Sequence, residues 1–379
     1  MDFSLTKHEE LFLQMIREFA EKEVKPLAAE IDEEERFPTE TVQKMSKLGL
    51  MGIPFPVEYG GAGGTNQIYS MAVEELSRVC GTTGVVVSAH TSLCCAPIYE
   101  FGTEEQKKKY LPKLCSGEWL GAFGLTEPNA GTDAAGQQTT AVATDEGYVL
   151  NGSKIFITNA EYAHVYIVIA MTDKSLGVKG ISAFIVEKGT PGFSTGKKEK
   201  KLGIRGSATC ELIFENCVIP KENLLGKVNE GFKIAMKTLD GGRIGIAAQA
   251  LGIAQGAMDE TVKYTKERKQ FGRSISQFQN TQFQLADLET KIQASRLLVR
   301  VAAYKKDKKM PYSVDAAQAK LFAAETAMEV TVKAVQFHGG YGYTRDYPVE
   351  RMMRDAKITE IYEGTSEVQR MVISANLLK

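Results

Sequence analysis

The sequence has little proline, no long apolar run and no excess of positive charge. Its 46 lysines and arginines are balanced by 47 aspartates and glutamates, for a formal net charge of -1. A nucleic-acid-binding surface shows a strong basic bias, so no nucleic-acid partner is expected. The longest strongly apolar stretch, residues 165–171, is much shorter than the roughly 20 residues of a membrane-spanning helix. We therefore expect no membrane span either.

Cysteine and histidine are also scarce. The six cysteines never form a Cys-x-x-Cys pair, and the four histidines stand singly, so neither a disulfide framework nor a zinc site is indicated. We expect reduced, buried thiols and no metal ion. The first residues lack both the basic and apolar regions of a secretory leader and the arginine-rich composition of a transit peptide. We therefore expect a cytoplasmic protein.

Length and composition favour a folded protein of several domains. A chain of 379 residues is expected to form two or three domains. Hydrophobic residues make up 43% and charged residues 25% of the chain, which is typical of globular domains. The 35 glycines are above and the 11 prolines below average usage. This combination suits long helices joined to a section rich in tight turns.

The N-terminal third of the sequence has helical spacing. Thr6 and Glu9 have the spacing of a capping box, and Leu11, Met15 and Phe19 follow at intervals of four. The glycine-rich run at 59–65 completes no phosphate-loop pattern, so we interpret it as a loop between helices. Residues 1–117 are therefore predicted to form a helical domain.

Between residues 118 and 229 the pattern changes to short runs rich in β-branched and aromatic residues. Asn151-Gly152 separates the first two runs, which predicts a hairpin turn at that point. The runs are not separated by the long helices that a dinucleotide-binding parallel sheet needs, so a compact, barrel-like β domain is expected. The runs are residues 148–150, 155–158, 165–170, 181–186 and 211–214.

From residue 230 to residue 379 helical spacing returns. Three apolar stripes predict three long helices and the C-terminal segment supplies a fourth, so a four-helix bundle is expected. The complete prediction is an α+β fold, with an N-terminal helical domain (1–117), a central β domain (118–229) and a C-terminal helical bundle (230–379). The stripes are Ile244, Ala248, Leu251, Ala254 and Met258; Leu285, Leu288, Ile292, Ser295 and Val299; and Ala317, Leu321, Ala324, Met328 and Val332.

Four segments contain residues that can bind a ligand or move a proton. Residues 125–133 offer hydroxyls and backbone N–H groups for a polar ring or phosphate, and residues 156–159 place an aromatic face beside a hydroxyl, which suits a flat heterocycle. Residues 268–272, taken with 336–342, offer an arginine for a pyrophosphate and glycines for close approach. Residues 361–367 place a carboxylate among apolar side chains, which raises its pKa toward that of a general base.

Each of these segments also has an ordinary structural interpretation. The first can be a simple turn, the second a strand end, the third a solvated helix end followed by a C-cap loop, and the fourth a solvated glutamate. Taken singly, each segment leaves both interpretations open.

Together, the motifs in these segments resemble those of the acyl-CoA dehydrogenase family, flavoenzymes that introduce an α,β double bond into acyl-CoA thioesters. The resemblance covers essentially the whole chain in the right order. Residues 238–247 and the compact length look most similar to the short-chain, butyryl-CoA branch. The motifs are Thr-Glu-Pro-Asn-Ala-Gly-Thr-Asp, Ile-Thr-Asn, Arg-Lys-Gln-Phe-Gly, Gln-Phe-His-Gly-Gly and Tyr-Glu-Gly-Thr.

The resemblance implies one FAD per subunit, between the β domain and the helical bundle. It implies a homotetramer built as a dimer of dimers, because part of each FAD site belongs to the neighbouring subunit. The implied FAD contacts are Phe123, Leu125, Thr126, Gly131, Thr132, Phe156 and Thr158; Arg268, Phe271, Gln279, Gln336, Gly339 and Gly340, most of them on the neighbour's side; and Thr365 and Glu367. The implied contacts of the acyl-CoA substrate are Thr132, Asp240, Arg243 and Gly364.

The resemblance also implies a mechanism. Glu363 removes the α proton of the thioester while the β hydrogen leaves as hydride to FAD. The Glu363 N–H and a ribityl hydroxyl of FAD stabilise the developing enolate. Electron-transferring flavoprotein reoxidises the reduced cofactor, and the same chemistry can run backwards to reduce an enoyl-CoA. No metal is needed.

Three positions depart from the usual family pattern. Asn129 and Thr132 stand where Gly and Ser are usual, and Phe156 stands where many members carry Trp. Other readings stay open: a different chain length or a branched acyl group, an acyl-CoA oxidase, which is typically a longer chain, or a non-catalytic scaffold. A scaffold is expected to lack the carboxylate of Glu363, which this sequence retains.

Overall fold

The computed structural model describes residues 4–379 of the chain. Helices form the first part of it. Helix α1 (Lys7–Phe19) begins at the predicted capping box of Thr6 and Glu9. Its buried face includes Leu13 and Ile16, whereas Leu11 is 58% exposed, so the predicted stripe was wrong at Leu11. The elements that follow are η1 (Ala20–Val24), η2 (Lys25–Leu27), α2 (Ala28–Glu33), α3 (Thr39–Lys47), η3 (Val57–Tyr59), α4 (Asn66–Val79), α5 (Gly81–Ala89), η4 (His90–Cys95), α6 (Ala96–Phe101) and α7 (Glu104–Cys115).

Two other predictions are confirmed, one about a loop in this part and one about the cysteines of the whole chain. Residues 60–65 form a loop between η3 and α4, and the loop ends where Thr65 caps α4. All six cysteines of the chain are buried and unpaired.

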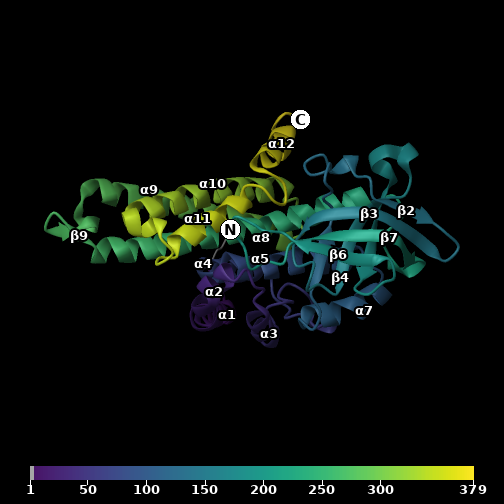
Figure 1. Cartoon of the computed structure of the whole chain (residues 1–379), viewed down its shortest axis with the longest axis horizontal. Coiled ribbons are helices and arrows are strands. Elements are labelled where there is room, and N and C mark those ends of the chain that lie inside the picture. The colour runs from purple at the N-terminus through teal and green to yellow at the C-terminus, as the bar shows by residue number, and fades with distance from the viewer. Residues whose placement is uncertain (1–3) are drawn as a thin grey trace.

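A curved sheet follows the first helices (Figure 1). Its order is β6-β7-β3-β2-β4-β5-β8, and β1 pairs in parallel with β4. The strands are β1 (Gly121–Gly124), β2 (Thr140–Ala143), β3 (Gly147–Ile157), β4 (Val165–Met171), β5 (Ile181–Glu187), β6 (Phe193–Lys198), β7 (Cys210–Pro220) and β8 (Leu224–Leu225), with short helical turns η5 (Ala134–Gly136), η6 (Lys174–Gly180) and η7 (Lys221–Asn223) between them.

The predicted hairpin turn at Asn151-Gly152 is wrong. Both residues lie inside the single strand β3, where the register with β7 shifts between Leu150 and Gly152. The turn lies earlier, at residues 144–146, where the Thr144 N–H donates to the Gly147 carbonyl at 2.8 Å. Pairing with β7 therefore overrides the local turn preference of Asn-Gly and accommodates it as a bulge.

The sheet encloses one hydrophobic core and covers another. In β4, Tyr166, Val168 and Ala170 face the inside of the curved sheet, whereas Val165, Ile167 and Ile169 face the helices. The apolar run seen in the sequence is thus a strand buried on both faces, and the sheet has the expected barrel-like curvature around its own core.

The C-terminal half is a helical bundle built around α8 (Gly231–Glu267), which packs against α4, α9, α10 and α11. The predicted α8 stripe from Ile244 to Met258 is buried throughout, but Val332 at the end of the third stripe is 47% exposed, so that stripe was wrong there. The remaining elements are β9 (Lys269–Gln270), β10 (Arg273–Ser274), η8 (Ile275–Gln277), α9 (Gln279–Asp307), α10 (Ser313–His338), η9 (Gly339–Tyr343), α11 (Val349–Thr359) and α12 (Ser366–Leu377).

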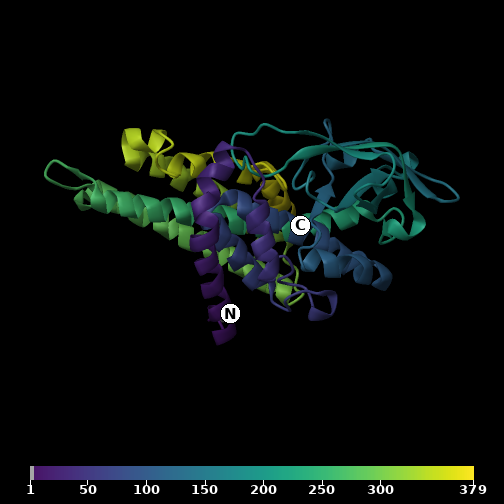
Figure 2. The ribbon, with the colours of Figure 1, turned by 60° about the horizontal axis from the view of Figure 1, so that its bottom comes forward.

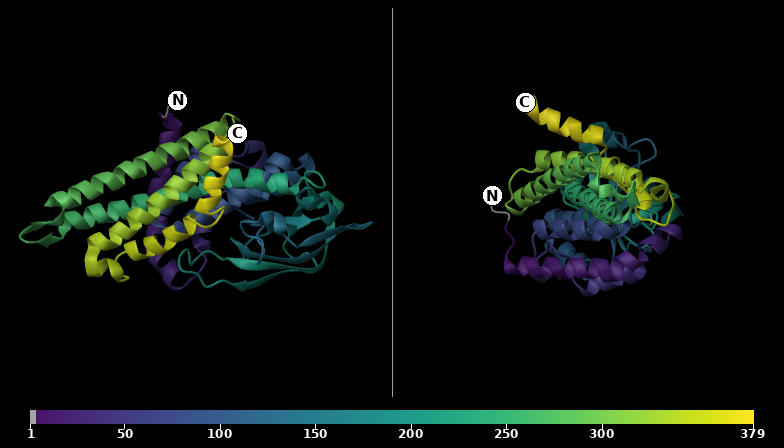
Figure 3. Two further views of the ribbon diagram at one scale, coloured as in Figure 1. Left: turned by 90° about the horizontal axis from the view of Figure 1, so that it is seen from above. Right: turned by 90° about the vertical axis from the view of Figure 1, so that its left-hand side faces the viewer.

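One end of the helical bundle lies against the sheet. The N-terminal helices lie along one side of the bundle and α12 lies on the other side (Figure 3), where it packs against α10. Helix α8 runs from the sheet to the β9–β10 hairpin at the opposite tip of the molecule (Figures 1 and 2). Within residues 4–379, no helix is both long enough and apolar enough to cross a membrane.

Candidate active site

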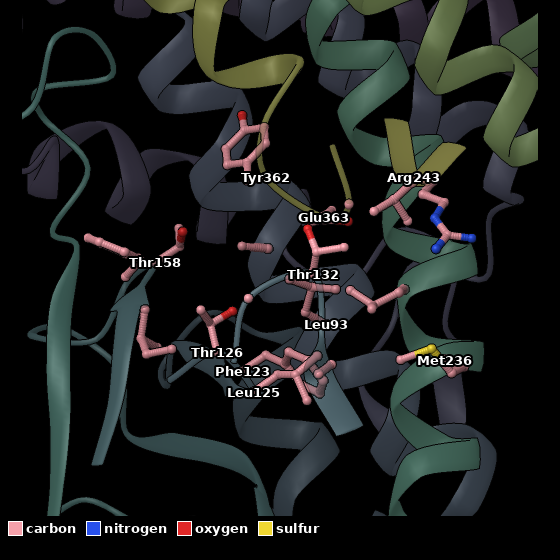
Figure 4. Close-up of a pocket in the computed structure, with 18 of the residues that line it drawn as sticks. Leu93, Phe123, Leu125, Thr126, Thr132, Thr158, Met236, Arg243, Tyr362 and Glu363 are labelled. Atoms are coloured by element: carbon pink, nitrogen blue, oxygen red, sulfur yellow. The ribbon is translucent and has the colours of Figure 1, made fainter. Parts of the chain in front are cut away.

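A cavity lies where the sheet meets the helices (Figure 4). Its volume is about 320 Å³, and it adjoins a hollow of about 630 Å³ that shares Thr126, Thr158 and Glu363 with it. Together they have the size of a ligand site. Most predicted site residues of the sheet domain and of the C-terminal segment line the first cavity, namely Phe123, Leu125, Thr126, Gly131, Thr132, Phe156, Thr158, Arg243, Glu363 and Gly364, and Thr365 lines the adjoining hollow.

The loop that carries Thr126 and Thr132 is held by a buried ion pair. Lys154 on β3 is fully buried and donates to the Glu127 carboxylate at 2.7 Å, to the Leu125 carbonyl at 3.1 Å and to the Gln137 side chain at 3.0 Å. Burial lowers the pKa of Lys154 to about 8, against the effect of Glu127. Burial alone would raise the pKa of Glu127, but the Lys154 charge and backbone donors hold it below its ordinary value. The pair therefore ties the loop to the sheet.

The end of β3 supplies an aromatic ring and a hydroxyl to the cavity. Phe156 has a positive φ of 59° and is 61% exposed, although it is apolar. The Asn159 amide donates to the Val86 carbonyl at 3.1 Å, which anchors this strand end to α5. The Phe156 ring and the Thr158 hydroxyl are thus presented to the cavity by a rigid support.

Glu363 enters the cavity from the helical side, on the segment between α11 and α12 (Figure 4). Its Oε2 atom is buried and has no hydrogen-bond partner among the described residues. Burial raises the pKa of Glu363 to about 8, while Lys320 and Arg243 act in the opposite direction. A carboxyl group with these properties can act as a general base near neutral pH.

Backbone strain gathers around the same space. Phe156, Ile204 and Glu363 all have positive φ angles, and all three line the larger hollow. Side-chain-bearing residues adopt this conformation at a cost of about 1–3 kcal/mol each, and such residues cluster at functional sites. For a β-branched residue such as Ile204 the conformation is a clear outlier. The strain supports a functional role for this space.

Asp240 and Arg243 form a partly buried ion pair one helical turn apart on α8. The Arg243 guanidinium donates to the Asp240 carboxylate at 2.6 Å, and the Ser313 hydroxyl donates to the same carboxylate at 2.9 Å. Arg243 lines the Glu363 cavity, whereas Asp240 lines a neighbouring cavity that also contains Lys237 and Lys306. The two predicted substrate contacts therefore face different cavities.

The predicted cofactor residues of the bundle tip are not brought to this cavity. Arg268 and Gln336 line a separate cavity of about 470 Å³, together with Gly339 and Gly340. From Arg243 to Arg268 the chain follows α8 for about 37 Å, at about 1.5 Å per residue. Phe271, 94% exposed, lies in the hairpin, and Gln279 begins α9. Within one chain these residues form a second group, so their link to the Glu363 cavity stays a prediction.

Glu367 lies outside both groups. It is exposed in the first turn of α12, and its neighbour Thr365 accepts a hydrogen bond from the Val368 N–H as the helix N-cap. In this chain Glu367 contacts neither cavity.

Sequence reasoning missed two buried lysines, Lys154 and Lys320. Both side chains are fully buried. Lys154 stands at an inward-facing position of β3, opposite Leu212, and Lys320 stands among the alanines of α10. A charged residue at a core-facing position of an apolar pattern was the available signal, because lysine is almost never fully buried without a partner.

Comparisons with known proteins agree over the whole chain. Residues 6–118, 122–217 and 229–378 match the models of the N-terminal, middle and C-terminal domains of acyl-CoA dehydrogenase. The chain is 65% identical over 379 residues to a Clostridium acetobutylicum protein named "Acyl-CoA dehydrogenase, short-chain specific", with both chains fully covered.

Two solved structures cover the chain completely and are themselves fully covered. The structure of butyryl-CoA dehydrogenase from Megasphaera elsdenii is similar with a TM-score of 0.98 and 54% identity. A chain from work described as "Electron transferring flavoprotein of Acidaminococcus fermentans: Towards a mechanism of flavin-based electron bifurcation" is similar with a TM-score of 0.99 and 60% identity.

Proposed function

The chain belongs to the acyl-CoA dehydrogenase family, and from that premise we propose that it is an FAD-dependent dehydrogenase of short-chain acyl-CoA thioesters that converts butyryl-CoA to crotonyl-CoA. The observation that carries the proposal is the Glu363 carboxyl group, which is buried at the cavity without a hydrogen-bond partner in the described chain. A structural glutamate is solvated or paired. An unpaired, buried carboxyl group suits the abstraction of a proton from a carbon acid.

The residues present fit a bound flavin. The exposed Phe156 ring offers a flat apolar wall, and the hydroxyls of Thr126, Thr132 and Thr158 line the same space. Such a set of donors and one aromatic face suits the polar edge and the flat face of an isoalloxazine ring. FAD, when bound, supplies the acceptor for the hydride.

Glu363 serves the thioester through its backbone as well as its side chain. Its N–H donates to no other group among residues 4–379, so it is free to donate to the thioester carbonyl oxygen. Negative charge develops on that oxygen as the α proton leaves, and a fixed donor stabilises the charge. One residue thus supplies the base and one of the donors.

The walls of the cavity support a short acyl chain. Leu93 on η4 lies close to Gly242 and Glu363, and Met236 and Leu239 on α8 close the same cavity. We infer that apolar side chains around the base limit the length of the acyl chain that the cavity accepts. A member of the family that accepts another chain length is the second candidate.

The partners follow from the same proposal. The second group of residues, at the bundle tip, completes the FAD site of a neighbouring subunit in a homotetramer. Electron-transferring flavoprotein, which is named in the description of one structural neighbour, exchanges electrons with the reduced enzyme. By microscopic reversibility, Glu363 returns the proton to the α carbon when crotonyl-CoA is reduced.

The test compares the parent enzyme with Glu363→Gln and with a matched control, Glu325→Gln on the outer face of α10. The Glu363→Gln variant is expected to retain FAD and bind butyryl-CoA but to lose turnover, since an amide cannot accept the α proton. Among residues 4–379, Glu325 forms only an exposed pair with Arg370, so its variant is expected to turn over normally. Undiminished turnover by Glu363→Gln would refute the assignment of the base.

Substrate class and oxidase activity are tested separately. Turnover is expected with butyryl-CoA and is expected to fall with acyl-CoA of increasing length. Preference for a long chain would overturn the proposed substrate. Rapid hydrogen peroxide formation in air, in place of reduction of electron-transferring flavoprotein, would favour an oxidase.

A further inference from the structure

Lys320 is a fully buried lysine in the N-terminal third of α10, and the mechanism described above does not use it. Its neighbours along the buried face of the helix are alanines at 316, 317, 323 and 324. It forms no ion pair with any residue of the described chain. An ammonium group removed from water is destabilising unless nearby groups compensate for it. Its position therefore calls for an explanation.

The Lys320 ammonium group binds the backbone beside the catalytic base. It donates to the Gly364 carbonyl at 2.7 Å, and the Gln369 side chain of α12 donates to the same carbonyl at 2.7 Å. Glu363 and Gly364 both have positive φ angles, 53° and 95°. Two donors from two helices thus hold a strained segment in one conformation.

Among the described residues, Lys320 is also one of two cations whose charge acts on the Glu363 carboxylate. The other is Arg243 of α8, whose charge is compensated by its 2.6 Å ion pair with Asp240. The other titratable groups facing Glu363 are Tyr362 on the same segment and Tyr69 on α4, whose pKa values are raised, so both are neutral near pH 7. Lys320 is therefore the cation without an ion-pair partner among the described residues that acts most strongly on the base.

The titration of both groups agrees with this geometry. Burial raises the pKa of Glu363 to about 8, and Lys320 is the first of the two charges that oppose the rise. Burial lowers the pKa of Lys320 to about 8. The charge of Glu363 is the first to oppose that fall, and those of Glu360 and Glu367 oppose it more weakly, whereas the charge of Arg243 lowers the pKa further.

We propose that Lys320 is a positioning residue for proton abstraction, which fixes the Glu363–Gly364 segment through the Gly364 carbonyl and supplies a buried positive charge that favours the ionised form of the Glu363 carboxyl group. This inference rests on the proposed role of Glu363 as the base. It assigns to α10 a part in the reaction besides its packing role.

The test measures the protonation of Glu363 directly. In the infrared spectrum of the holoenzyme, the carboxylic acid band absent from Glu363→Gln reports protonated Glu363 and is titrated against pH. In Lys320→Met the midpoint is expected to rise by about one pH unit or more, because a facing opposite charge is lost. The acid limb of the kcat/KM profile for butyryl-CoA is expected to move with it.

Matched variants separate the charge from the anchor and from packing. Lys320→Arg keeps the charge, because arginine stays protonated, and is expected to leave the midpoint close to the parent value. Gln369→Leu removes the other donor to the Gly364 carbonyl without changing any charge, so its kcat is expected to fall while the midpoint stays. Glu325→Gln, an exposed charge change on the same helix, is expected to alter neither.

An unchanged midpoint in Lys320→Met would overturn the inference, as would an equal shift in Gln369→Leu. If Lys320→Met does not fold, Lys320→Gln removes the same charge with a smaller, polar side chain and is expected to give the same shift. Undiminished turnover in Glu363→Gln would show that the proposed function fails. The infrared titration would still decide, as a separate question, whether the charge of Lys320 shifts the protonation of Glu363.

Discussion

Gly242 is a position at which adding one methyl group is expected to lower activity with little effect on stability. A Cβ added there would lie 1.9 Å from the Glu363 Oε2 atom and 2.8 Å from the Leu93 Cδ2 atom. Ordinary contact begins at 3.4 Å, so the carboxyl group of Gly242→Ala must move by about 1.5 Å. The atoms that give way are the ends of flexible side chains, so the fold can absorb the change.

The displacement is expected to lower the rate of the reaction strongly and to change the stability of the fold little. A misplacement of about 1 Å at a reacting group lowers rates about 100-fold, so we expect Gly242→Ala to lose at least about 100-fold in kcat/KM. Alanine is favoured over glycine in a helix interior by about 1 kcal/mol, which offsets the repacking around Leu93. The thermal midpoint is therefore expected to change little.

The neighbouring residue supplies the control. A Cβ on Gly241 would meet only the Lys306 Nζ atom closely, at 2.8 Å, and the Tyr312 hydroxyl lies at 3.9 Å. Gly241→Ala thus makes the same change in helix propensity without touching Glu363. The assay is the rate of flavin bleaching after rapid anaerobic mixing with butyryl-CoA, with thermal unfolding measured alongside. Parent-like bleaching in Gly242→Ala, or an equal loss in Gly241→Ala, would show that the position of the Glu363 carboxyl group against Gly242 does not control the rate.

Three further predictions concern the loop, the base and the assembly. Lys154→Met leaves Glu127 buried without its cation and is expected to destabilise the fold by about 3–5 kcal/mol, measured by urea unfolding. It is also expected to weaken FAD retention, measured by gel filtration. Adding Glu127→Gln should restore part of the lost stability, and no restoration would contradict a direct pairing of the two side chains. Because the folded-state pKa of Glu363 is raised to about 8 from an ordinary 4.5, the folded state binds more protons between these values, so its stability falls as pH rises through that window. Glu363→Gln should therefore be more stable than the parent at pH 9. A thermal midpoint that changes with pH equally in both proteins across this range would contradict the raised pKa. Co-expressed Arg268→Met and Glu363→Gln subunits should regain activity that neither has alone, because one site of a mixed dimer then carries both native residues; absence of recovery would place Arg268 outside a shared site.

The parts of the fold that depend on local sequence were predictable. The capping box at Thr6 and the buried stripe of α8 depend on residues three or four positions apart, and both are confirmed. The turn at Asn151-Gly152 was wrong because long-range pairing of β3 with β7 decided the outcome. The exposure of Val332 shows the same limit, since only the packing of α10 against its neighbours sets the phase of the buried face.

The site divides in the same way. Segments 123–132, 156–158 and 363–365 line one continuous space, which is where the resemblance placed the cofactor and substrate. The roles of Lys154 and Lys320 were out of reach, because a lysine in the sequence gives no distance to a carbonyl or a carboxylate. Residues at the bundle tip cannot be placed by one chain, since their expected ligand lies on a second copy.

The proposed function requires that this chain binds FAD and that Glu363 starts the reduction of that FAD by an acyl-CoA. The most direct test is the visible spectrum of the purified holoenzyme before and after anaerobic addition of butyryl-CoA, with Glu363→Gln and a long-chain acyl-CoA measured alongside. We predict a flavin band that butyryl-CoA bleaches in the parent only, with little response to the long-chain thioester. A protein that binds no flavin, or a band that bleaches equally in Glu363→Gln, would contradict the account.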